Sequence, residues 1–123
     1  STILAAAGLD APSSFQGRSL IATASGTDPS PRQDIFSAWH GSQLGAFTQR
    51  MIRDYDWKYV WNATCEDELY NLAEDPGELN NLAREAPAVL LNYRRRLIGW
   101  MESLGDPALN LWTKAAMESG RKL

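Results

Sequence analysis

The clearest pattern of hydrophobic and polar positions lies in residues 50–62, where apolar and charged side chains alternate. Trp57, Tyr59 and Trp61 share one side of this stretch. A period of two that is rich in aromatic residues predicts two short strands, here joined by a turn at residues 54–56. Because alternate side chains point to the same face of a sheet, we expect the aromatic face to be the buried one.

Two further segments have the character of strands. Residues 34–39 alternate, and residues 69–72 form a short apolar stretch typical of an edge strand. Residues 40–49 contain two glycines and several polar side chains, which favours a loop. The sequence Asp75-Pro76-Gly77 predicts a type II turn, in which proline fixes φ at the first central position and Gly77 takes the positive φ of the second.

The pattern changes to a helical one at Pro87. Apolar residues then recur in steps of three and four as Leu90, Tyr93, Leu97, Trp100, Met101 and Leu104. This spacing predicts an amphipathic helix over residues 87–104, with Pro87 in its first turn. Gly105, Asp106 and Pro107 form a stop signal. A weaker helical pattern follows around Leu111 and Trp112.

These elements predict an α+β fold with a small antiparallel sheet of three to four strands packed against one long C-terminal helix. We expect the core to form where the aromatic face of the sheet meets the apolar stripe of the helix. Its members would be Trp57, Tyr59 or Trp61 on the sheet, and Leu97, Trp100 and Met101 on the helix.

Composition narrows the classes of function. The 123 residues carry a net charge of -3, and no apolar run is long enough to span a bilayer. Nucleic-acid binding depends on clustered Lys and Arg, so the charge argues against it. The basic run 94–96 lies in the predicted helix and is typical of a solvated face. A single cysteine, Cys65, excludes an intrachain disulfide, and the acidic residues beside it favour an unreactive thiol.

The acidic residues match no calcium-binding loop and are expected to be solvated carboxylates beside turns. They are Glu66, Asp67, Glu68, Glu74, Asp75 and Glu78. Asn62-Ala63-Thr64 fits a glycosylation sequon, which is a weak signal because short matches are common.

Residues 50–83, together with Gly17-Arg18-Ser19-Leu20, resemble the C-terminal subdomain of a type I sulfatase, the family of arylsulfatases and polysaccharide sulfatases. The resemblance extends over residues 1–104. It implies that residues 1–33 are the end of a catalytic-domain helix plus a linker and that residues 34–105 are the subdomain itself. Residues 106–123 would be a C-terminal tail.

In that family the nucleophile is a formylglycine made within a Cys/Ser-x-Pro-x-Arg motif, assisted by calcium. The motif is absent: Cys65 is followed by acidic residues, and Ser14 has Arg18 four positions on but Gln16 in place of proline. The resemblance therefore implies a parent enzyme that hydrolyses aryl or carbohydrate sulfates, with formylglycine and calcium in a catalytic domain outside this chain. No catalytic or metal-binding residue is expected within it.

The same resemblance makes the catalytic domain of the parent chain the expected partner. Residues 3–7 are apolar and look like a helix separated from its neighbours, so pairing with another copy of the chain through this segment is a further expectation. A periplasmic or secreted parent is compatible with the family, but the sequence leaves the compartment open.

His40 is the main candidate for contact with substrate. It is the sole imidazole of the chain, follows a predicted strand and precedes Gly41. In the family this edge of the subdomain faces the catalytic pocket, which adds Trp39, Gln43 and Arg50 as substrate-binding candidates. The alternative is that His40 caps the strand and bonds a backbone carbonyl.

Two other classes of function remain open. A free-standing carbohydrate- or protein-binding module could use Trp39, Trp57 and Trp61 as a stacking platform. A related phosphoesterase could carry a similar subdomain. The sequence preceding Ser1 would distinguish these possibilities from a sulfatase.

Overall fold

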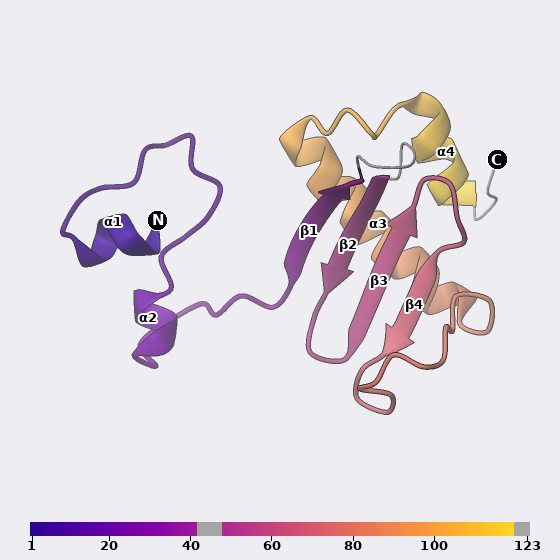
Figure 1. The fold of residues 1–123 in the computed structure, drawn as a ribbon, viewed down its shortest axis with the longest axis horizontal. Coiled ribbons are helices and arrows are strands. Elements are labelled where there is room, and N and C mark those ends of the chain that lie inside the picture. Colours follow the sequence, from indigo (N-terminus) through magenta and orange to yellow (C-terminus); the bar gives the residue numbers. More distant parts are fainter. Residues whose placement is uncertain (42–47, 120–123) are drawn as a thin grey trace. The chain divides into compact units, whose positions relative to one another are not determined.

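The computed structural model describes residues 1–41 and 48–119. The chain divides into two units, Ser1–Arg32 and Gln33–Leu123. The first unit holds short helices, and the second holds a sheet backed by helices (Figure 1). No helix formed by these described residues is long and apolar enough to cross a membrane.

The first unit contains α1 (Thr2–Ala6) and α2 (Ile21–Ala24), and neither helix has a buried residue. Helices this short are marginal without packing. Polar contacts hold the unit together, including the ion pair between Arg18 and Asp28 at 3.0 Å. Ile3 is 85% exposed. The predicted linker thus contains one helical turn that its Ser- and Thr-rich composition did not indicate.

The second unit is built on a four-stranded antiparallel sheet in the order β1-β2-β3-β4. The strands are β1 (Ile35–His40), β2 (Thr48–Arg53), β3 (Trp57–Asn62) and β4 (Glu68–Asn71). Each pairs with its neighbour in sequence, as expected for short connections. The predicted turn between β2 and β3 is confirmed: the Asp54 carboxylate accepts hydrogen bonds from the backbone N–H groups of Asp56 and Trp57.

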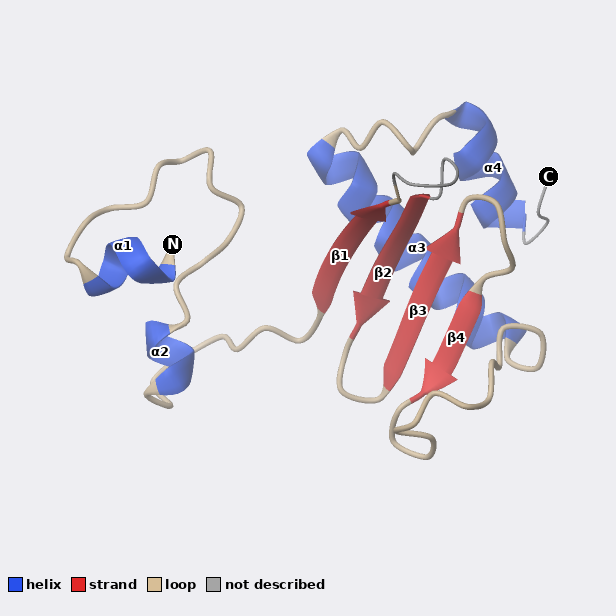
Figure 2. Cartoon of the chain, viewed as in Figure 1, coloured by secondary structure: helices blue, strands red, loops and turns tan. Residues whose placement is uncertain are grey.

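Strand register decides which side chains face the core. Ile52 pairs with Tyr59, and Tyr59 with Leu69, so the three lie on one face. All three are fully buried. Trp61 belongs to the same core, and Trp57 packs against it, which confirms the predicted aromatic face. Figure 2 shows α3 lying across one side of the sheet.

The long helix α3 spans Pro87–Leu104, the range predicted from its periodicity. Gly105 ends it in the left-handed conformation (φ 61°), the backbone shape that glycine adopts at least cost. Leu97 and Met101 are fully buried in the core. Trp100 stacks on Phe36 of β1 with ring centroids 5.0 Å apart. The fold class and the predicted core are therefore confirmed.

A second helix, α4 (Leu111–Ser119), covers the weaker helical pattern of the C-terminal segment. Met117 is its buried residue and joins the core. Leu111 and Trp112 remain 87% and 75% exposed.

The predicted type II turn at Asp75-Pro76-Gly77 is wrong. The turn closes through a hydrogen bond from the Glu78 N–H to the Asp75 carbonyl, at 3.1 Å. The residue with positive φ is Glu78 (φ 55°), whereas the φ of Gly77 is not positive. Proline followed by a residue with negative φ also suits a type I turn, so the Pro-Gly pair did not discriminate between the two types.

The prediction that Arg94 and Asp67 are solvated is also wrong. Arg94 and Asp67 are 6% and 5% exposed and form an ion pair at 2.6 Å. The Tyr59 hydroxyl donates to the same carboxylate oxygen at 2.9 Å. Burying a charge is tolerated when it is paired and hydrogen-bonded, as it is here. Because the partners are 27 residues apart, the pairing cannot be predicted from the local sequence around either residue.

Asn62 of the sequon is 5% exposed. Its amide nitrogen donates to the Glu66 carbonyl at 2.8 Å and to the Glu68 carboxylate at 3.0 Å. A glycan on this nitrogen would have to displace both bonds, so the folded domain does not present the sequon for modification.

Candidate functional site

The candidate site lies where β1 ends and β2 begins. His40 closes β1 and pairs in register with Thr48, the first residue of β2. The His40 Nδ1 atom lies 2.7 Å from the Thr48 hydroxyl oxygen. His40 is exposed and Thr48 is half-buried. The sheet thus fixes both residues at one end of its first two strands.

Arg50 lies two residues after Thr48 in β2, on the same face of the sheet, and is 2% exposed. Its guanidinium holds the Asp106 carboxylate through two bonds, from Nε to Oδ2 at 2.5 Å and from Nη2 to Oδ1 at 2.8 Å. Nη2 also lies 3.2 Å from His40 Nε2, and Nη1 donates to the Gln49 carbonyl at 2.8 Å. A two-pronged Arg–carboxylate contact fixes both groups in orientation as well as in distance.

Asp106 owes its place to the end of α3. Gly105 turns the chain, and the Asp106 N–H then donates to the Met101 carbonyl at 2.9 Å. The hydrogen bonds from Arg50 lower the pKa of Asp106 despite the burial that opposes them. The Ala108 N–H, which donates to Oδ1 at 2.9 Å, acts in the same direction. Asp106 is therefore an anion that neutralises the buried Arg50.

Trp39 lies on the opposite face of the sheet from His40, because neighbouring residues of a strand alternate in direction. Its side chain is 53% exposed. A Cβ atom at Gly41 would come within 2.5 Å of the Trp39 ring, so glycine is required there for the ring to lie as it does. Beside Trp39 in register is Gln49, whose amide donates to the Asn62 side chain at 2.5 Å.

The structure brings together two of the four sequence candidates, His40 and Arg50. Trp39 lies on the other face, and Gln43 falls outside the described residues. Within residues 1–41 and 48–119, the hydrogen bonds of the His40 ring go to the side chains of Thr48 and Arg50 rather than to a backbone carbonyl.

Two residues of this cluster were missed from the sequence. Asp106 was assigned to a helix stop signal, and Thr48 to a polar loop. Asp106 is 56 residues from Arg50, so the contact depends on how α3 crosses the sheet. The sequence does place Arg50 on the same face of the predicted strand as Ile52, and an arginine on an apolar face needs an acidic partner.

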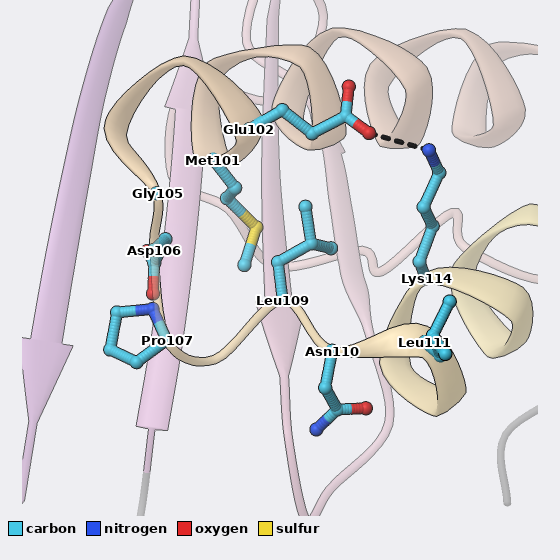
Figure 3. A pocket seen from close by; sticks show the side chains of 9 residues that line it. All are labelled: Met101, Glu102, Gly105, Asp106, Pro107, Leu109, Asn110, Leu111 and Lys114. Atoms are coloured by element: carbon cyan, nitrogen blue, oxygen red, sulfur yellow. Dashed lines mark hydrogen bonds and ion pairs between the residues drawn. The ribbon is translucent and has the colours of Figure 1, made fainter.

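A groove lies beyond Asp106, between the end of α3 and the start of α4, and has a volume of about 640 Å³. Met101 and Leu109 supply apolar walls, and a 2.5 Å ion pair joins Glu102 to Lys114 across it (Figure 3). The groove shares Asp106 with the cluster around Arg50.

Within residues 1–41 and 48–119, no group of three or more His, Cys, Asp or Glu side chains is arranged to hold a metal ion. The sulfatase resemblance places the expected calcium in a catalytic domain outside this chain. Cys65 is exposed as a free thiol.

Comparison with known proteins gives a consistent picture. Residues 1–98 match the family described as N-sulphoglucosamine sulphohydrolase, C-terminal. Arylsulfatase K of Xenopus laevis is 32% identical over 107 residues, which cover 78% of this chain and 20% of that protein. The chain spans between 20% and 42% of the length of three of the curated relatives that it matches.

Two solved structures share the fold. The phosphonate monoester hydrolase of Agrobacterium radiobacter superposes with a TM-score of 0.70 and 26% identity, covering 83% of this chain and 23% of that one. A protein solved in complex with its substrate D-glucosamine-2-N,6-O-disulfate gives a TM-score of 0.66 and 24% identity, covering 84% and 22%.

Proposed function

The chain belongs to the family of N-sulphoglucosamine sulphohydrolase C-terminal domains, and we propose that it forms the C-terminal part of a larger enzyme that hydrolyses sulfate esters. The match over residues 1–98 is the observation that carries this proposal. The identity with arylsulfatase K supports it, since that protein is named as a sulfatase and is about five times as long as the matched stretch. The substrate would be an aryl or carbohydrate sulfate.

The roles proposed for this chain and for the catalytic domain follow from the residues that this chain contains. The chain lacks the Cys/Ser-x-Pro-x-Arg motif from which the family makes its nucleophile. Formylglycine and calcium would be supplied by the catalytic domain of the same parent chain, which is also the proposed partner. This chain would complete the fold and supply one edge of the substrate pocket.

We assign that edge to the end of β1 and the start of β2. His40 is exposed there and is held in place by Thr48 and Arg50. Arg50 is buried, so its part would be to position His40 rather than to bind substrate itself. Trp39, on the other face, offers an exposed ring on which an aromatic or sugar ring can stack. Gln43 remains a proposed contact.

A phosphoesterase is the second candidate, favoured by the likeness to a phosphonate monoester hydrolase. Sulfate and phosphonate monoesters both present anionic oxygens around a central atom, so one subdomain can serve both chemistries. The deciding residues would then lie in the catalytic domain.

The test uses the longer protein that contains this chain, purified and assayed in parallel on an aryl sulfate and an aryl phosphonate. The proposal predicts that kcat/KM is at least about a hundredfold higher on the sulfate, a difference of about 2.7 kcal/mol in transition-state binding. A preference for the phosphonate would select the phosphoesterase. Turnover of neither ester would refute both.

A further inference from the structure

The donors and acceptors in the hydrogen bonds of His40 can be assigned from the chemistry of its partners. A guanidinium has five N–H donors and no acceptor. The 3.2 Å contact between Arg50 Nη2 and His40 Nε2 therefore has arginine as donor and the imidazole nitrogen as acceptor. An imidazole that accepts at Nε2 is neutral and carries its hydrogen on Nδ1.

The same assignment determines the donor in the hydrogen bond between His40 and Thr48. Since Nδ1 carries the hydrogen, it donates to the Thr48 hydroxyl oxygen across 2.7 Å. A threonine hydroxyl that accepts this bond still has its own hydrogen to donate. Among residues 1–41 and 48–119, the contact to His40 is the one hydrogen bond made by that hydroxyl.

The side chains of Arg50 and Asp106, which hold His40 from the buried side, are themselves fixed. Asp106 holds Arg50 with two bonds, and both side chains are nearly inaccessible, at 7% and 2% exposure. The backbone of Thr48 is fixed as well, because its carbonyl accepts the Ala63 N–H at 3.1 Å. The hydroxyl donor is therefore held by the fold before any ligand arrives, which lowers the entropy cost of binding.

We propose that Thr48 is a substrate-binding residue whose hydroxyl, directed by the relay Asp106–Arg50–His40, donates a hydrogen bond to an anionic oxygen of the sulfated substrate. This rests on the proposed function and deepens it. Asp106, Arg50 and His40 are positioning residues in this arrangement. Thr48 is half-buried and is the first residue of β2, beside the exposed His40.

The kinetic test compares Thr48→Val and Thr48→Ser in the longer protein. Valine has the shape of threonine without the hydroxyl, so kcat/KM on a sulfate ester should fall at least about tenfold, as for one bond to a charged group. Serine keeps the hydroxyl and should stay within about threefold of wild type. Thr113→Val is the matched control, because Thr113 is also half-buried but bonds Asn110 at the start of α4. Wild-type kinetics in a folded Thr48→Val protein would overturn the proposal.

A second measurement tests the relay without turnover. Nitrogen-15 NMR of the longer protein, labelled at histidine, should show His40 with an unprotonated Nε2 and a protonated Nδ1. In Asp106→Asn, which loosens Arg50, the ring should shift toward the other tautomer. A protonated Nε2 in the wild type would reverse the direction of the relay and refute the inference. Loss of all sulfate turnover in the wild-type parent would instead refute the proposed function, leaving the NMR result intact.

Discussion

At the scale of single residues, the Arg50–Asp106 pair links the end of α3 to the strand that carries the candidate site. Both side chains are nearly inaccessible, and their two hydrogen bonds are short. Removing one partner of such a pair leaves a buried charge that neither water nor protein compensates. The same contact thus stabilises the fold and orients His40.

Asp106→Asn should therefore lower the free energy of unfolding at pH 7 by about 3 kcal/mol. The pKa of Asp106 is lowered in the folded chain, so its stabilising effect is complete above the ordinary carboxyl pKa of about 4 and is lost as pH falls below it. The difference between variant and wild type should shrink from pH 7 to pH 3 in urea unfolding. Glu66→Gln, at the exposed pair with Arg84, is the control and should change stability by less than about 0.5 kcal/mol. A gap that widens toward pH 3 would contradict the assignment.

At the scale of elements, α3 is joined to β1 by the stacked rings of Trp100 and Phe36, whose planes differ by 6°. Trp100 packs against the core cluster without being fully buried. Aromatic stacking adds to the burial of the ring area.

Trp100→Ala should cost about 3 kcal/mol of unfolding free energy, the lower end of the range for large aromatic residues because the ring is half-buried. The matched control is Trp112→Ala, since Trp112 is 75% exposed and should cost less than about 0.5 kcal/mol. Urea melts of both variants measure the difference. Equal losses would show that α3 does not depend on this stack.

The outcome for each element shows what sequence can and cannot predict. Periodicity located α3 to the residue and identified the aromatic face of β3, because burial of one face requires those patterns. The Arg94–Asp67 pair was missed because ionic partners are chosen by the packing of distant segments. The positive φ at Glu78 was missed because Pro-Gly fits more than one turn type.

The candidate site was predicted only in part, because some of its contacts join segments that are distant in sequence. His40 could be selected because its residue type and its glycine neighbour are local features. Thr48 became visible through strand register, and Asp106 through the crossing of α3 over the sheet. The structure supplied the relay by joining the adjacent ends of β1 and β2 to Asp106, which is 56 residues from Arg50.

At the scale of the whole molecule, the chain corresponds to one domain of the longer proteins that it matches. The family match identifies the chain as a C-terminal domain of the sulfohydrolase family, and the relatives that it matches are longer than it is. The helices of the unit Ser1–Arg32 bury no side chain, which fits a segment that obtains its packing from elsewhere. Pairing of two copies through this segment stays a prediction.

The isolated 123-residue chain should show no sulfatase activity, with or without added calcium. The reason is the missing nucleophile motif. A chromogenic aryl sulfate provides the assay, and a heat-killed sample is the baseline. Turnover above that baseline would mean that the chain carries a nucleophile of its own.

The central claim is that the His40 end of the sheet handles the substrate of a sulfate-ester hydrolase. The most direct measurement is His40→Ala in the longer enzyme, with kinetics on a sulfate ester and a thermal melt of the same preparation. We predict a fall in kcat/KM of at least about tenfold, or about 1.4 kcal/mol of transition-state binding, with a stability change below about 1 kcal/mol. Unchanged kinetics with a lowered melting temperature would contradict the claim and leave His40 a purely structural role.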